Sequence, residues 1–143
     1  MSLIEDISLK ERDEYIVTNV IADGVLARTV LMPKGEIVVG EIHKYESINI
    51  LVKGELKVWV NGEVKHLKAP YMIKSNANTR KVAYILEDTV WTSIHRVNSE
   101  NLEDIEEEII VKVDREALIK ELKQINMKEL KCLGYHKVSH PNN

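Results

Sequence analysis

The sequence predicts a mainly β protein: an antiparallel β-barrel followed by a helical C-terminal appendage. Two observations predict this fold. Turn-forming residues recur about every ten positions over the first two-thirds of the chain, as in all-β sandwiches and barrels. The runs between these turns are rich in Val, Ile, Thr and Trp, which favour strands. The predicted strands cover residues 25–32, 36–43, 47–52, 55–60, 63–67 and 89–97.

The clearest local signal is the dipeptide Asn61-Gly62, which separates two of these strand-like runs. A tight type I′ hairpin turn requires positive φ at both central residues, and Asn followed by Gly adopts that conformation at little cost. We therefore expect residues 55–60 and 63–67 to form an antiparallel hairpin.

The last third of the chain changes character. Residues 99–108 form an acidic run that we expect to be solvated, and it ends at a short apolar patch, 109–111. Asp114 is a suitable N-cap for a helix over 115–125, followed by a second short helix that ends near Gly134. The residues spaced to share one face of the first helix, and expected to pack on the outside of the barrel, are Leu118, Leu122 and Ile125.

The 143 residues correspond to one domain, with a barrel core over 24–97 and an acidic segment, short strand and helical tail over 98–143. A composition of 44% hydrophobic and 30% charged residues excludes a disordered chain. The net charge of −3, without a basic stripe, argues against nucleic-acid binding. No apolar run is long enough for a membrane span, and the first residues do not resemble a signal peptide. With one cysteine, Cys132, these features predict a cytoplasmic protein.

Candidate site residues lie in the strand predicted over 36–43. A period of two places Ile37, Val39, Glu41 and His43 on one face, which we expect to line the barrel interior. The Cα atoms of Glu41 and His43 would be about 7 Å apart, a spacing that allows both side chains to ligate one metal ion. The alternative interpretation is that these two residues mark a strand end that enters solvent.

This stretch resembles the first motif of the cupin family, in which Gly, five residues, His-x-His, three residues, Glu, six residues and Gly follow one another. Gly35 and Gly54 occupy the two glycine positions, Glu41 and His43 stand at His-x-His, and Ser47 stands at the glutamate. The resemblance implies a cupin-like jelly-roll barrel over residues 24–97.

The second cupin motif is present in outline over residues 69–88, where Asn76 and Asn78 replace its Pro and Gly and Arg80 or Lys81 stands near its histidine. Two segments, 43–51 and 87–95, are similar to parts of small cupin-like proteins from tailed-bacteriophage genomes. The resemblance therefore implies a phage-type protein, located in the host cytoplasm or in the virion.

In the cupin family that this stretch resembles, the metal site consists of two or three histidines and a glutamate. His43 is the one of these positions at which this sequence has the same residue as the family. Ser47 is a poor ligand and Arg80 would repel a cation, whereas His95 can supply a further nitrogen. The candidate metal ligands are His43, Glu41 and His95. The candidates that line the barrel pocket are Glu41, His43, Ser47, Asn49, Arg80 and His95.

These observations favour a non-enzymatic, phage-type binding or structural and accessory protein that acts through its barrel pocket or its outer surfaces. The alternative is a metal-dependent cupin enzyme of the dioxygenase or isomerase type with a degenerate ligand set. We expect no catalytic residue and no cofactor. The alternative, a metal-dependent enzyme, would require a divalent transition metal. The expected partners are a second copy of the chain, in a dimer or higher oligomer, other phage proteins or a small-molecule ligand, but not nucleic acid or a membrane. Trp59, which shares a strand face with Glu55 and Lys57, is the predicted interface residue.

Overall fold

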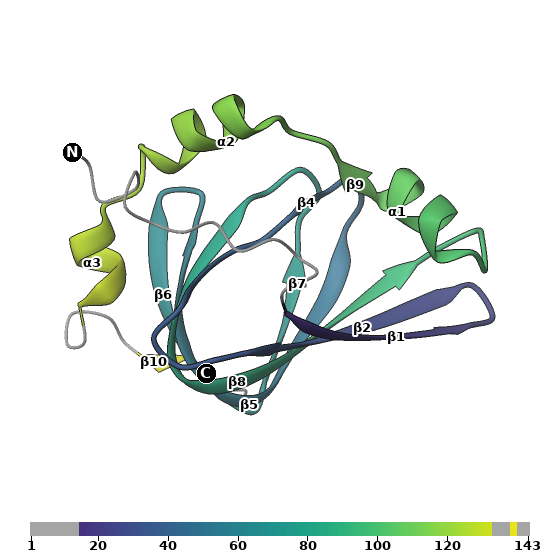
Figure 1. Cartoon of the computed structure of the whole chain (residues 1–143). Coiled ribbons are helices and arrows are strands. Elements are labelled where there is room, and N and C mark those ends of the chain that lie inside the picture. The colour runs from purple at the N-terminus through teal and green to yellow at the C-terminus, as the bar shows by residue number, and fades with distance from the viewer. Residues whose placement is uncertain (1–14, 133–137, 140–143) are drawn as a thin grey trace.

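A computed structural model describes residues 15–132 and 138–139 of the chain. Over these residues eight strands form one sheet and two short strands form a second (Figure 1). The strands of the large sheet are β1 (Ile16–Ala22), β2 (Val25–Met32), β3 (Ile37–Val39), β5 (Ser47–Val60), β6 (Glu63–Lys68), β7 (Tyr71–Ser75), β8 (Lys81–Arg96) and β10 (Val138–Ser139). The remaining elements are β4 (Ile42–His43), β9 (Ile110–Val111), α1 (Leu102–Ile109), α2 (Arg115–Leu122) and α3 (Met127–Lys131).

Two long strands, β5 and β8, close the large sheet into a barrel because each takes part in both of its walls. The first half of β5 pairs with β7 and with the second half of β8, which in turn pairs with β2. The second half of β5 pairs with β6 and with the first half of β8, next to β3. The register shifts between Leu51 and Leu56 mark the bend. Gly54 lies at this bend with φ +101°, and a Cβ there would come within 2.6 Å of the Asp88 carbonyl oxygen.

Every strand pairing over residues 24–97 is antiparallel, as predicted. The predicted hairpin is confirmed, with Asn61 at φ 50° and Gly62 at φ 82°. A second turn of the same kind, Asp23 at φ 47° and Gly24 at φ 83°, joins β2 to β1, a strand that the sequence analysis did not predict.

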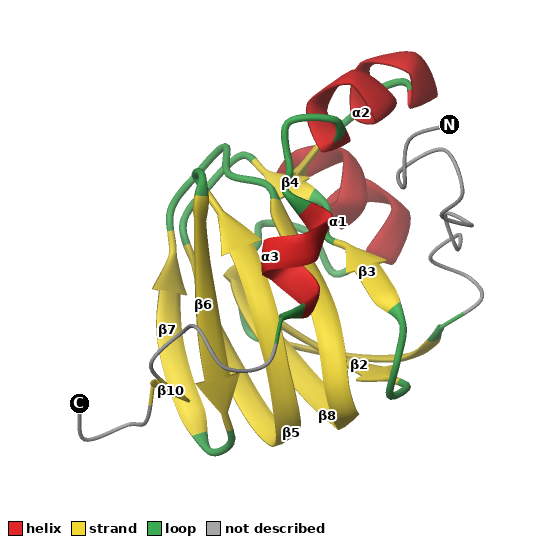
Figure 2. Ribbon diagram, turned by 90° about the vertical axis from the view of Figure 1, so that its left-hand side faces the viewer, coloured by secondary structure: helices red, strands yellow, loops and turns green. Residues whose placement is uncertain are grey.

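Apolar residues on the inward faces of these strands fill the barrel. Leu51, Leu56, Val58 and Ile85 are buried together there with Met32 and Leu67. The opposite face of β5, β6 and β8 carries a second cluster beneath α2 and α3, and Figure 2 shows α3 lying across these strands. No helix over the described residues is long and apolar enough to cross a membrane.

The helical tail packs on the outside of the barrel, as predicted. Leu122 and Ile125 are buried and Leu118 is half-buried against Val64 and Val82, although α2 itself ends at Leu122. Asp114 is its N-cap and accepts a hydrogen bond from the Ala117 N–H.

The interface predicted at Trp59 is wrong, because the chain's own helices cover that strand face. Trp59 packs into the cluster under α2 and α3. The neighbouring Lys57 is fully buried, and its Nζ donates hydrogen bonds to the carbonyl oxygens of Glu129 and Cys132 at the end of α3.

The acidic run over 99–108 is not wholly solvated, since most of it forms α1. Ile105 and Ile109 are buried against Leu26 and Val97, while the acidic side chains lie on the other faces of the helix. The apolar residues stand four apart, so they form a helical stripe that the density of acids conceals in the sequence.

The single strand predicted over 36–43 is also wrong, because the chain breaks at Gly40. The Gly40 N–H donates to the Lys81 carbonyl oxygen, and β3 and β4 lie on either side of the break. Val38 points into the barrel, whereas Ile37 and Val39 pack in the cluster under the helices. The expected common face of Ile37, Val39, Glu41 and His43 therefore does not form.

Candidate functional site

A cluster of polar side chains occupies one end of the barrel interior, next to β4 and α1. In Figure 1 β4 and β9 lie side by side there, and α1 leads directly into β9. The cluster, which we call the interior polar cluster, contains Arg28, His43, Ser47, Asn49, Ser75, Lys81, Trp91 and His95.

Strand periodicity places these residues inside. Along β5, Ser47, Asn49 and Leu51 are all buried and alternate with more exposed neighbours. Arg28 is also buried, two residues after Leu26 on the inward face of β2. The inward face of β5 is therefore polar at its start and apolar from Leu51 onward, and Arg28 lies on the inward face of β2 between Leu26 and Val30.

The imidazole rings of His43 and His95 contact each other, with their centroids 4.5 Å apart and an angle of 39° between the ring planes. One ring nitrogen of His95, Nε2, lies 3.0 Å from Ser93 Oγ. Burial, followed by the charges of His95, Lys81 and Arg28, lowers the pKa of His43 to about 3. Burial, followed by the charges of Arg28 and Lys81, lowers the pKa of His95 to about 4. Both imidazoles are therefore neutral near pH 7.

Lys81 reaches across the barrel from the first residue of β8. Its Nζ donates a hydrogen bond to Ser75 Oγ on β7, in the opposite wall. Asn49 Nδ2 donates to the same Ser75 Oγ, and Asn49 Oδ1 accepts from Trp91 Nε1 at 3.0 Å. Burial lowers the pKa of Lys81 to about 8, so the ammonium is still mostly protonated at neutral pH.

The second cation of the cluster, Arg28, is held by two neighbours. Its Nε donates to Asn19 Oδ1 at 2.7 Å on β1, and its Nη2 lies 3.2 Å from Glu106 Oε1 on α1. The guanidinium is buried, so its charge is felt by both histidines in a region of low dielectric.

The structure brings four of the six predicted pocket residues together, namely His43, Ser47, Asn49 and His95. Arg80 lies elsewhere. Its Nε and Nη2 lie 3.2 and 3.3 Å from the two carboxylate oxygens of Glu121 on α2, and its Nη1 donates to the Gly40 carbonyl oxygen. Glu41 lies in the break between β3 and β4 with its Oε2 buried.

Four cluster members, Arg28, Ser75, Lys81 and Trp91, were not among the predicted pocket residues, and Arg80 was predicted in the place that Lys81 occupies. Strand periodicity carries the signal that was needed. Lys81, Ala83 and Ile85 alternate onto the inward face of β8, which selects Lys81 over Arg80.

The donor set does not fit the transition metal that a cupin-like barrel implies. A catalytic zinc site takes three protein ligands, and the described residues contain no group of three or more His, Cys, Asp and Glu side chains placed to hold a metal ion. The two imidazoles that do meet are faced by a lysine ammonium and an arginine guanidinium, which repel a cation.

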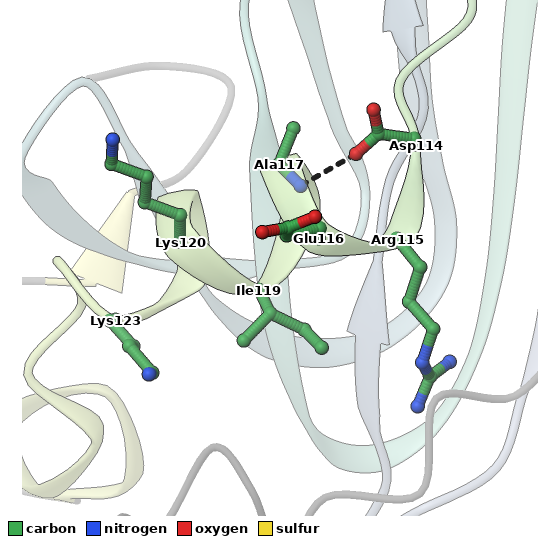
Figure 3. Close-up of a pocket in the computed structure, with 7 residues that line it drawn as sticks. All are labelled: Asp114, Arg115, Glu116, Ala117, Ile119, Lys120 and Lys123. Carbon is green, nitrogen blue, oxygen red and sulfur yellow. Dashed lines mark hydrogen bonds between the residues drawn. The ribbon is translucent and has the colours of Figure 1, made fainter.

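Two surface hollows lie away from this cluster. One, of about 760 Å³, runs along α2, and Figure 3 shows it with the capping hydrogen bond from Ala117 to Asp114. The other, of about 380 Å³, lies beside Gly54 at the bend of the barrel. Both are lined by residues of mixed charge outside the interior polar cluster.

No protein-family model and no curated protein matches this sequence. Among solved structures, a cupin 2 domain-containing protein from Halorhodospira halophila is similar with a TM-score of 0.57 and 11% identity, over 80% of this chain and 81% of that one. A cupin superfamily protein from Desulfitobacterium hafniense has a TM-score of 0.51 and 14% identity, over 68% and 90%. Salicylate 1,2-dioxygenase from Pseudoaminobacter salicylatoxidans has a TM-score of 0.53 and 9% identity, over 63% of this chain and 27% of that one.

The neighbours include an enzyme as well as proteins of unknown function, so they leave the activity of this chain open. At such identities the likeness establishes the fold alone. The chain has a cupin-like, jelly-roll β-barrel with short helices at its C-terminal end.

Proposed function

We propose that this chain is a non-enzymatic binding protein that keeps the cupin-like barrel without the chemistry of a catalytic metal. The observation that carries the proposal is that His43 and His95 meet at 4.5 Å while the described residues place no third His, Cys, Asp or Glu side chain to complete a metal site. The charges of Arg28 and Lys81 also act on both rings. A divalent cation at the histidine pair would meet like charge in a region of low dielectric, which costs more than two imidazole ligands return. The metal-dependent dioxygenase or isomerase is therefore the weaker candidate.

The phage-type role is part of the same proposal. Its support is the similarity of residues 43–51 and 87–95 to segments of small cupin-like phage proteins. In that setting the protein would serve as a structural or accessory component in the host cytoplasm or the virion, with other phage proteins as partners.

We further propose that the partner surface is the outward face of β1, β2, β8, β5 and β7, and that its occupant is a second copy of the chain. This face, called the outer sheet face below, is largely apolar. Its exposed hydrophobic side chains include Ile16, Val20, Leu31, Ile48 and Met72, which are 39–67% exposed.

Charged residues stand at the rim of the outer sheet face, where Lys74 pairs with Glu46 and Arg96 ends β8. Thr29 and Thr92 lie between the apolar side chains, and their hydroxyl oxygens, 2.7 Å apart, hydrogen-bond each other. A largely apolar surface with a polar rim is the anatomy of a protein interface. The paired parts of the five strands are five to eight residues long and together cover about 600 Å² when the face is taken as flat, close to the roughly 800 Å² per partner of a stable complex.

Metal analysis of the natively purified protein tests the first part of the proposal. We expect far less than one equivalent of iron, manganese, nickel or zinc per chain. We also expect His43→Ala to fold with a loss on the order of 1 kcal/mol, because it removes a half-buried polar group. The control is His66→Ala, which removes a histidine that pairs with Glu55 outside the cluster. About one equivalent of metal, lost in His43→Ala and kept in His66→Ala, would overturn the proposal in favour of the enzyme.

A further inference from the structure

Lys81 is a half-buried cation whose charge is not balanced by a carboxylate. Over the described residues its Nζ donates to the hydroxyl of Ser75, and no ion pair joins it to Asp or Glu. A charge that is partly removed from water is normally paired, because an ammonium that loses water contacts without gaining a counter-charge is destabilised. An ammonium has three N–H donors, so Lys81 retains hydrogen-bonding capacity beyond Ser75.

His43 supplies a second donor that is not used within the cluster. Its ring stacks on His95, but over the described residues it makes no hydrogen bond. The side chain is half-buried, so it still reaches solvent at this end of the barrel. A neutral imidazole carries one N–H, which can donate to an acceptor placed beside it.

The other members of the cluster have hydrogen-bond partners within the cluster or beside it. Asn49 bonds Ser47, Ser75 and Trp91, and Arg28 bonds Asn19 and Glu106. They form a fixed frame, and the guanidinium adds positive potential to it. The hydrogen-bond donors that stay available are N–H groups of Lys81 and His43, and they lie next to positive charge. Donors beside positive charge favour an anion over a metal ion or a neutral sugar.

We infer that the interior polar cluster binds a small oxyanion, a carboxylate or a phosphate group, whose oxygens accept hydrogen bonds from Lys81 Nζ and the His43 imidazole. This inference rests on the proposed function, since it names the ligand class of a barrel that does not hold a metal. The anion balances the Lys81 charge and occupies the open donor of His43, and Arg28 stabilises it through space.

Isothermal titration calorimetry with sodium phosphate, sodium gluconate and glucose tests the inference on the full chain. Phosphate and gluconate separate the two sources of an oxyanion, and glucose is the neutral comparison. We expect at least one of the two anions to bind and glucose not to bind. Lys81→Met and His43→Gln should each weaken anion binding about tenfold or more, the effect of losing a hydrogen bond to a charged group.

The matched control is Lys34→Met, which removes an exposed lysine paired with Glu87 on the surface. It should leave anion affinity unchanged. If Lys81→Met fails to fold by circular dichroism, Lys81→Arg, which keeps the charge, should fold and retain binding. Nitrogen-15 shifts of the His43 ring should move during the anion titration while those of His66 stay in place.

Each other outcome overturns the inference, and three of them leave the proposed function standing. Anion binding that is insensitive to Lys81→Met and His43→Gln, or glucose binding as tight as anion binding, overturns the inference alone. The absence of binding by both anions does the same. Stoichiometric binding of a transition metal that shifts the His43 ring overturns the inference and the proposed function together.

Discussion

His43 on β4 and His95 near the end of β8 stack their rings at 4.5 Å inside the barrel, where both are kept neutral by burial and by nearby cations. Two neutral imidazoles can share this space, whereas two imidazolium ions would repel each other and also Arg28 and Lys81. The contact therefore makes the stability of the fold depend on pH.

The first prediction is that acid destabilises the protein through these two histidines. An unfolded histidine takes up its proton near pH 6.5, whereas the folded chain resists protonation until about pH 4 at His95 and about pH 3 at His43. Between those values the unfolded state binds more protons, so the free energy of unfolding falls as the pH is lowered. Each histidine should contribute a loss of about 1–2 kcal/mol between pH 7 and pH 5, the half-buried His43 less than His95.

Urea unfolding at a series of pH values measures this dependence. His95→Gln should flatten the curve between pH 7 and pH 4, whatever it does to stability at pH 7. Val52→Gln, which changes an exposed residue of β5 without adding or removing a titratable group, should leave the slope as in the parent protein. Equal slopes in the parent and in His95→Gln would contradict the assignment.

The second prediction concerns Gly54, the residue that lets β5 bend against β8. Its φ of +101° strains any other residue, and a Cβ would collide with the Asp88 carbonyl and with Thr89. We expect Gly54→Ala to cost about 3 kcal/mol or more, strain and overpacking combined. Gly62→Ala is the control: it has a φ of +82° but open space around its Cβ, and should cost only about 1 kcal/mol. Thermal unfolding measures the melting temperature of each variant. An equal decrease in both variants would show that the close approach of residue 54 to Asp88 and Thr89 contributes little.

The sequence predicted those parts of the fold that are encoded locally. The turn at Asn61-Gly62 depends on two adjacent residues. The N-cap at Asp114 depends on a hydrogen bond from Ala117, only three residues further along. The break at Gly40 depends on a hydrogen bond to Lys81, a residue on another strand, and no local pattern reports it. One break was enough to turn Ile37 and Val39 to the opposite face from the one expected.

The candidate site was predicted in part for the same reason. His43, Asn49 and His95 were selected from motif positions and strand phase, and they do meet. Lys81 enters the cluster only because β8 bends, so that its first residue faces Ser75 in the opposite wall. A pairing between two walls of a barrel is a tertiary property, which one sequence read along its length does not contain.

The third prediction concerns Lys57, which secures α3 from beneath. Its buried Nζ donates to the Glu129 carbonyl oxygen at 3.0 Å and to that of Cys132, two of the groups left open at the end of the helix. Lys57→Met keeps the aliphatic stem and removes both bonds, so we expect a loss of about 2 kcal/mol. Hydrogen exchange at the Leu130 amide, which bonds Asn126 within α3, should accelerate. Lys53→Met, at an exposed position of the same strand, should change neither quantity.

The last prediction is that the chain forms a dimer through the outer sheet face. Leu31 and Ile48 lie on strands that flank β8 and are 39% and 46% exposed, at a place where a second copy would cover them. Leu31→Glu and Ile48→Glu would each bury a carboxylate without a partner at a self-complementary interface, where a two-fold axis repeats the cost. Light scattering at micromolar concentration should report twice the monomer mass for the parent protein and the monomer mass for both variants. Tyr45→Glu introduces the same charge at an exposed position in the turn before β5 and should leave the dimer intact. Two results would rule out this face: a monomeric parent protein, or a dimer that persists in both variants while circular dichroism shows the fold intact. An unpaired carboxylate buried in the interface would dissociate a dimer formed through this face.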